Sequence, residues 1–189
     1  MNAGAITSIP HYVRRTVMLI FKRRLGNVKN SFVGFCVVLA WVLLVPTTWA
    51  EENGVEAQNK AMVVAGFDAW KNGTGSPYEQ LADNATWTIE GHSLASRTYN
   101  GREDLMANVI RPFNARMSGR LIPTIRNIYT DGDTVIVHFD AAGMAKDNKP
   151  YRNTYAWFLT YKGNKIVNAT AFYDSIAFND FWQRVQPAS

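Results

Sequence analysis

The sequence predicts an α+β domain, in which a curved antiparallel sheet is wrapped on helices that come mostly before it in the chain. Two observations support this prediction. Apolar residues recur at helical spacing in several stretches before residue 117, and residues 120–175 alternate between apolar and polar side chains as strands do. The dipeptides Asp131-Gly132, Asp147-Asn148 and Gly163-Asn164 divide this second region into strands joined by tight turns.

The first 50 residues carry the positive charge of the chain. They contain six basic residues, at positions 14, 15, 22, 23, 24 and 29, and no acidic residue. The other 139 residues hold 14 Lys and Arg against 15 Asp and Glu, so the formal net charge of +5 belongs to this leader. We therefore expect no nucleic-acid partner, because such binding needs basic residues on the folded surface.

An apolar run in the leader predicts export. Residues 32–45 are uncharged and follow the basic residues, as in a signal peptide, and Thr48-Trp49-Ala50 supplies small residues for a cut after Ala50. The alternative is an uncleaved anchor, because the uncharged span 30–50 has 21 residues and could cross a bilayer. In either case we expect residues 51–189 to form one domain outside the cytoplasm, in the periplasm or secreted, with any membrane contact limited to the N-terminal segment.

Four stretches of the remaining sequence predict helices. Residues 52–72 and 102–116 show helical spacing of apolar residues and end at Asn-Gly and Ser-Gly pairs. Proline suits the first turn of a short helix at residues 77–81. The last helix spans residues 176–185, and Asp174 or the serine after it can cap its start.

Alternating side chains predict five strands. They lie at residues 85–90, 121–129, 134–144, 151–161 and 165–173. The last four follow one another through tight turns and so predict an antiparallel meander. Between the first strand and the long second helix we expect a plain turn at Tyr99-Asn100-Gly101.

Three stretches carry a resemblance to a known family. They read LADNATWTIEG from position 81, YNGREDL from position 99 and GNKIVNATAFYDS from position 163. The chain resembles the SnoaL-like and ketosteroid-isomerase-like branch of the nuclear transport factor 2 superfamily over residues 55–186. This resemblance implies that residues 51–189 form a cone-shaped, cystatin-like α+β roll with an apolar pocket, and a homodimer through the outer face of the sheet.

Catalytic positions of the family are replaced in this sequence. The aspartates that the steroid isomerases use fall on Ile89 and Trp157, neither of which can transfer a proton. The arginine and first aspartate of limonene epoxide hydrolase fall on His138 and Asp140, and its second aspartate falls on Ala171. We therefore expect neither of these two activities.

The remaining polar residues define a candidate site. His138 and Asp140 lie on one face of their strand, and the resemblance implies that this face lines the pocket. Burial would then raise the pKa of Asp140 and suit it to act as a general base, with His138 as its partner. Alternatively, the two side chains pair across a half-exposed face and only satisfy each other. We expect the ligand to contact Trp87, Ile89, His92, Asn153, Tyr155, Trp157, Ala171 and Tyr173.

The sequence favours an exported module that binds a small, largely apolar molecule in an aromatic pocket. One alternative is an isomerase, lyase or hydrolase that uses Asp140 with His138 for acid–base chemistry. Another is an interaction module that forms a dimer. The histidines at positions 11, 92 and 138 show no ligand spacing, so we expect no metal. No phosphate-binding loop or nucleophile motif is present, and we expect no cofactor.

Overall fold

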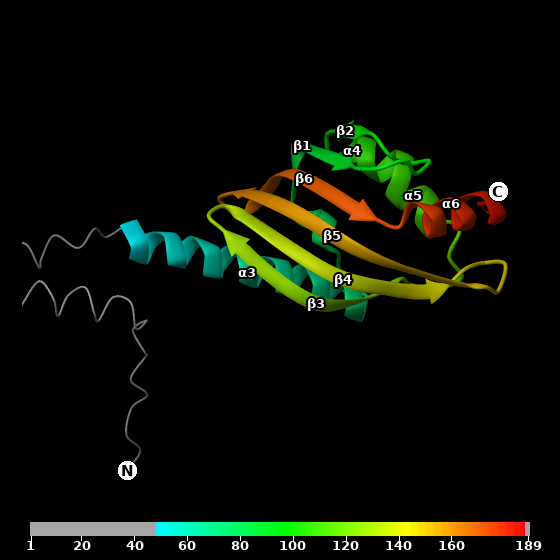
Figure 1. Ribbon diagram of the computed structural model, residues 1–189, viewed down its shortest axis with the longest axis horizontal. Coiled ribbons are helices and arrows are strands. Elements are labelled where there is room, and N and C mark those ends of the chain that lie inside the picture. Colours follow the sequence, from blue (N-terminus) through cyan, green and yellow to red (C-terminus); the bar gives the residue numbers. More distant parts are fainter. Residues whose placement is uncertain (1–47, 188–189) are drawn as a thin grey trace, which may run out of the picture. The chain divides into compact units, whose positions relative to one another are not determined.

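The computed structural model describes residues 48–187, which belong to one compact unit that begins at Thr48 (Figure 1). The apolar run at residues 32–45, Cys36, His11 and the basic residues of the leader lie outside the described residues. The expected cut after Ala50 falls in the first turn of the first described helix. Within residues 48–187, no helix is both long and apolar enough to cross a membrane.

Six strands form one sheet in the order β2-β1-β6-β5-β4-β3. Their bounds are β1 Leu81–Ile89, β2 Thr98–Asn100, β3 Ile122–Asp131, β4 Thr134–Met144, β5 Pro150–Lys162 and β6 Lys165–Tyr173. The meander from β3 to β6 is antiparallel, as expected. β1 pairs with β6 in parallel, and β2 pairs with β1 in antiparallel fashion. The α+β prediction is confirmed, with a sheet that is mixed at one edge.

The helices lie on one side of this sheet. They are α3 Thr48–Asn72, the short 3₁₀ helix η1 Pro77–Gln80, α4 Arg102–Leu105, the π-helical turn η2 Met106–Ile110, α5 Arg111–Asn114 and α6 Ser175–Arg184. α3 packs against β3 and β4, whereas α4 packs against β1 (Figure 1). Asp174 caps α6 as expected, because its carboxylate accepts hydrogen bonds from the backbone N–H groups of Ile176 and Ala177.

Two local features differ from the sequence-based expectation. The segment expected to be a plain turn at residues 99–101 contains the short strand β2, whose Tyr99 pairs with Trp87. The expected single helix at residues 102–116 is three continuous segments with a π-helical turn in the middle. Pro112 lies two residues after the end of that turn. Its lack of an N–H group and its bulky ring disfavour a regular α-helix there.

The strand register places the odd-numbered residues of β1, β4, β5 and the carboxyl-terminal half of β6 on the inner, helix-covered face. Phe139 lies opposite Tyr155, and Val137 lies opposite Trp157, which in turn lies opposite Ala171. Side chains at directly opposed positions point to the same face of a sheet. These inner residues are buried and form the core with Phe67 of α3. The inner face therefore supplies both the core and the wall of any cavity beneath the helices.

Candidate functional site

A cavity of about 570 Å³ lies between the inner face of the sheet and the helices. The sheet contributes mostly aromatic and small apolar side chains to its wall: Trp87, Ile89, Tyr155, Trp157, Ala171 and Tyr173. The helices and loops contribute Trp70, Tyr78, Leu105, Met106, Val109, Ile110, Phe113, Leu121 and Phe178, with polar groups at Ser76, Glu79, Asn114 and Arg120. Such a cavity, apolar with a few polar groups, is typical of small-molecule sites.

Trp157 lies at the centre of the aromatic wall. Its ring stacks on that of Trp70 at 6.0 Å between centroids and meets Trp87 edge-to-face at 5.0 Å. Phe139 packs against it from the core at 4.8 Å. Each of these rings also contacts others, so the wall is a continuous layer of packed aromatic side chains.

Three tyrosines line the cavity: Tyr78, Tyr155 and Tyr173. Burial raises the pKa of each phenol, and the neighbouring phenols raise it further. All three therefore stay protonated near neutral pH. Within residues 54–187 the Tyr78 hydroxyl has no hydrogen-bond partner, which leaves it available to a ligand.

The hydrogen of the Tyr155 hydroxyl is directed by residues behind the cavity wall. The Oδ1 atom of Asn153 accepts from the backbone N–H of Asp174 at 2.9 Å, so its amide nitrogen must donate to the Tyr151 hydroxyl oxygen at 3.0 Å. Tyr151 is buried, and its one other partner among the described residues is the Tyr155 hydroxyl at 2.9 Å. An unmade buried donor is costly, so Tyr151 donates to Tyr155. Tyr155 then has a free hydrogen to offer a ligand.

The mouth of the cavity carries a cation beside a tightly placed glycine. Gly73 is the first residue after α3. Its φ angle is +75°, a conformation that favours glycine. The Arg120 guanidinium lies so close that a Cβ at position 73 would fall 1.8 Å from its Nη1. Glu79 also borders the cavity and is exposed.

Six of the expected ligand contacts line the cavity, whereas two do not. The six are Trp87, Ile89, Tyr155, Trp157, Ala171 and Tyr173. His92 is an exposed loop residue whose carbonyl accepts from Asn179 at 3.5 Å. Asn153 is buried one layer behind the wall, where it orients Tyr151 as described above. The expected direct contact of His92 and Asn153 with the cavity is therefore wrong.

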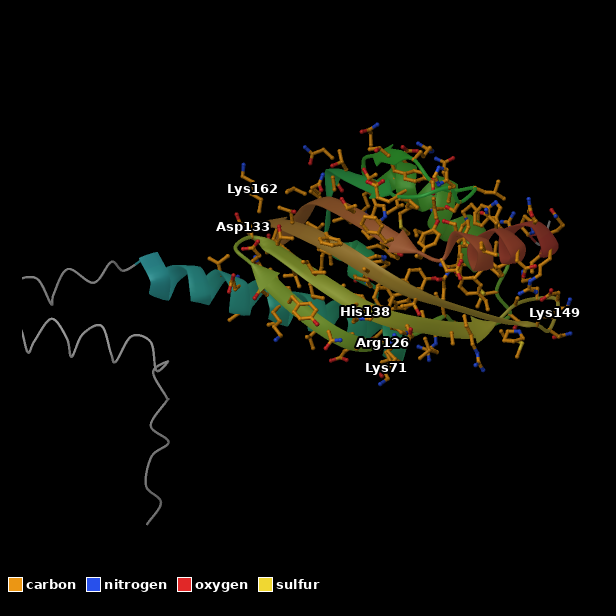
Figure 2. The ribbon with its side chains drawn as sticks, in the orientation of Figure 1. Lys71, Arg126, Asp133, His138, Lys149 and Lys162 are labelled. Carbon is orange, nitrogen blue, oxygen red and sulfur yellow. The ribbon has the colours of Figure 1, made fainter. Side chains whose placement is uncertain are left out.

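The expected place of His138 and Asp140 in the cavity is also wrong. Both lie on the outer face of β4, where the Asp140 carboxylate accepts hydrogen bonds from Arg126 Nε at 2.6 Å and Thr154 Oγ1 at 2.7 Å. Figure 2 shows Arg126 and His138 on the neighbouring strands β3 and β4. The Thr154 and Arg126 hydrogen bonds lower the pKa of Asp140 where burial was expected to raise it. A carboxylate with a lowered pKa, outside the cavity, is a weak base with no access to a ligand there.

Sequence reasoning missed the helical side of the cavity. Trp70, Tyr78 and Met106 line it from α3, η1 and η2. Trp70 lies three residues after Phe67 in the first predicted helix, which is a weak pattern for a shared face. Nothing in the sequence pattern brings Tyr78 or Met106 opposite the sheet. In the part of the chain that the structure describes, no three His, Cys, Asp or Glu side chains gather into a potential metal site.

Solved structures confirm the fold. A protein from a soil-derived mobile gene cassette, Bal32a, aligns with a TM-score of 0.57 and 21% identity over 68% of this chain and 98% of its own. A nuclear transport factor 2-like protein from Burkholderia thailandensis aligns at 0.53 and 20%, over 63% and 93%. A candidate SnoaL-like polyketide cyclase from Jannaschia sp. CCS1 aligns at 0.54 and 17%, over 66% and 90%. At these identities the likeness establishes the fold and nothing finer.

A search among curated proteins finds no significant match to this sequence. The sequence model of the SnoaL-like domain family, in contrast, matches residues 55–169. That range takes in most of α3, the sheet as far as the first half of β6, and most of the residues that line the cavity. The family match and the fold agree: the chain belongs to the SnoaL-like domain family and has a nuclear transport factor 2-like fold.

Proposed function

We propose that the domain binds a small, largely apolar molecule in the cavity, with a carbonyl or similar acceptor group facing Tyr155. The observation that carries this proposal is the cavity itself: about 570 Å³, walled by aromatic and aliphatic side chains, with hydroxyl groups at a few points. This volume lies within the range of roughly 300–1,000 Å³ that small-molecule sites occupy. The free hydrogen of Tyr155 supplies one directed contact.

Binding accounts for this cavity better than acid–base catalysis does. Among the described residues that line it, Glu79 is the single carboxylate, and it lies exposed at the mouth. The phenols of Tyr155 and Tyr173 keep their protons because burial raises their pKa, so neither phenol supplies a base. A site of this kind can hold and orient a ligand, whereas the expected base, Asp140, lies on the other side of the sheet.

To test the proposed binding site, a large side chain is introduced at a position in the cavity wall. Ala171 faces the cavity, whereas its neighbour Thr170 faces the outer side of the sheet. We expect Ala171→Phe to abolish binding of the probe 9-fluorenone, measured by quenching of tryptophan fluorescence, and Thr170→Phe to leave it unchanged. Circular dichroism checks that both variants fold. Equal binding by the two variants would contradict the proposed site.

A second pair of measurements tests the Tyr155 contact without any change in volume. Tyr155→Phe removes the hydroxyl but keeps the ring. We expect the variant to bind 9-fluorenone about tenfold more weakly, the order of magnitude of a lost hydrogen bond, while fluorene, which lacks the carbonyl, binds as before. If both probes lose affinity equally, Tyr155 has a packing role only.

We also propose that the outer face of the sheet forms a homodimer. Phe158 of β5 and Phe172 of β6 are 37% and 46% exposed there, and their rings pair at 5.9 Å between centroids. Adjacent exposed aromatic side chains are unusual on a monomer and favour an interface. Phe158→Lys should shift the mass measured by light scattering toward that of a monomer, whereas Lys162→Ala at the end of the same strand should not. A wild-type monomer at micromolar concentration would contradict the proposal.

The leader supports a further proposal, that the domain works outside the cytoplasm. The support is the order of basic residues, apolar run and small residues before Glu51. Cell fractionation of the tagged full chain should place the domain in the periplasm or medium, or on the outer side of the membrane. N-terminal sequencing then separates cleavage after Ala50 from an uncleaved anchor. Recovery of the full chain in the cytosol would contradict the proposal.

A further inference from the structure

A chain of hydroxyl groups leads from the cavity wall into the loop between β1 and β2. The Tyr173 hydroxyl oxygen lies 2.8 Å from Ser93 Oγ, which lies 2.9 Å from Ser96 Oγ. Tyr173 lines the cavity, whereas both serines lie behind the wall, and Ser93 is buried. The direction of each hydrogen in this chain of hydroxyl groups follows from neighbouring backbone groups that can only donate or only accept a hydrogen bond.

Ser96 fixes the far end of the chain. Its Oγ lies 3.2 Å from the Glu90 carbonyl oxygen, which can only accept, and 2.9 Å from the backbone N–H of Ser93, which can only donate. A serine hydroxyl has one hydrogen and two acceptor positions. The hydrogen of Ser96 therefore goes to Glu90, and its second acceptor position takes the hydrogen of Ser93 Oγ.

Ser93 passes this direction on to Tyr173. Its oxygen accepts from the backbone N–H of Ala95 at 3.3 Å, and its own hydrogen is used by Ser96. The remaining acceptor position faces Tyr173, so Tyr173 must donate. The reverse order would turn the Ser96 hydrogen toward Ser93 and break its hydrogen bond to the Glu90 carbonyl. The single hydrogen of Tyr173 thus points away from the cavity, and its oxygen can only accept.

We infer that Tyr173 accepts a hydrogen bond from the ligand, so that the natural ligand carries an O–H or N–H group at this point. The inference rests on the proposed function, since it concerns a ligand in the same cavity. Tyr155 presents the opposite polarity, a donor, and the two rings lie 5.7 Å apart between centroids. A matching ligand is apolar and ring-containing, with a hydroxyl or amine donor and a carbonyl acceptor on the same side, as in a hydroxylated aromatic ketone.

Matched probes test this polarity. The full chain is titrated with 2-, 3- and 4-hydroxy-9-fluorenone and with the three corresponding methoxy compounds, whose oxygen can accept but not donate. For the isomer that reaches Tyr173, we expect the hydroxy compound to bind about tenfold more tightly, because the methoxy oxygen would face the Tyr173 oxygen without a hydrogen between them. Equal affinities for all three pairs would overturn the inference.

Two variants away from the cavity should remove this preference. Ser93→Ala takes away the acceptor for the Tyr173 hydrogen. Ser96→Ala takes away the acceptor for the Ser93 hydrogen, which then turns to Tyr173. Each change releases the Tyr173 hydrogen toward the cavity. The methoxy probe then gains affinity, and the ratio of hydroxy to methoxy affinity falls toward one. Ser118→Ala is the control. The Ser118 hydroxyl donates to the Met144 carbonyl and takes no part in the hydroxyl chain, so this variant should keep the wild-type ratio of hydroxy to methoxy affinity.

The outcomes separate this inference from the proposed function. If no fluorenone binds to the wild-type chain, the proposed function fails. If the probes bind but Ser93→Ala and Ser96→Ala keep the wild-type ratio, the inference fails while the function stands. Should Ser93→Ala not fold, Ser96→Ala and Tyr173→Phe decide the matter, because Tyr173→Phe must also abolish the preference. A simple packing role for the loop would weaken both members of a probe pair equally.

Discussion

Two adjacent residues of β4, His138 and Phe139, offer a test of which face of the sheet is the core. Phe139 is 0% exposed, and its ring lies 4.8 Å between centroids from each of Phe67, Tyr155 and Trp157. Phe139→Ala removes these contacts, together with a fourth to Trp70 at 6.0 Å, and leaves a cavity in the packed core. Such truncations cost about 3–5 kcal/mol.

The effect is large against the stability of a domain of this size. Net stabilities of single domains are about 5–15 kcal/mol. With a urea dependence of about 2 kcal/mol per molar, a loss of about 4 kcal/mol lowers the unfolding midpoint by about 2 M. His138→Ala, one residue earlier and on the outer face, should change the free energy of unfolding by no more than about 0.5 kcal/mol. Urea titration followed by far-ultraviolet circular dichroism measures both.

The comparison is decisive because the two side chains differ by one position in the strand. A reversed register would bury His138 and expose Phe139, and the two effects would exchange. If His138→Ala proves as damaging as Phe139→Ala, or if Phe139→Ala is nearly neutral, the assignment of the faces is wrong. The cavity wall built on Tyr155 and Trp157 would be wrong with it.

Two further predictions concern close packing and acid stability. Gly143→Ala should destabilise the fold by about 1–3 kcal/mol, because the new Cβ would lie 2.8 Å from the Arg120 carbonyl oxygen. Gly119→Ala is the control and should be nearly neutral, because no atom lies within 4 Å of its new Cβ. Thermal unfolding compares the two variants. Hydrogen bonds, first of all from Arg97, lower the pKa of Asp104 in the folded state. Asp104 therefore stabilises the fold fully above its unfolded pKa of about 4, and this contribution is lost as the pH falls through the lower folded pKa. The urea midpoint of Asp104→Asn should thus fall less on acidification than that of the wild-type protein. An equal fall in both proteins would contradict this.

Alternation predicted five of the six strands and which residues of each strand share a face, and the family resemblance supplied most of the sheet side of the cavity. The error over His138 and Asp140 came from the pairing between strands. The turn between β4 and β5 is centred on Asp147, and Met144 lies opposite Pro150. This symmetry places odd-numbered residues opposite odd-numbered ones, so Phe139, and not its two neighbours, shares a face with Tyr155. The position of the turn, read for its parity, would have given the right face.

Other features leave no comparable trace in the sequence. The register shift of β3 between Ile125 and Asn127 and the π-helical turn before Pro112 are single-residue adjustments to tertiary packing. The direction of hydrogens from Ser96 to Tyr173 depends on a loop closing over the end of β6, which no periodicity encodes. The family resemblance supplied the fold and the existence of a cavity, but the polarity inside it required coordinates.

The two faces of the sheet can serve separate purposes because strand alternation assigns them different residues. Thr170 and Phe172 point outward from β6, whereas Ala171 between them points into the cavity. A change on the outer face should therefore affect the proposed dimer interface without touching the cavity, and a change on the inner face should do the reverse. The loop serines add a third level of control, since they lie on neither face and still set which hydrogen bonds Tyr173 can make. If the proposed polarity of Tyr173 holds, ligand selection in this domain depends partly on residues that no ligand contacts.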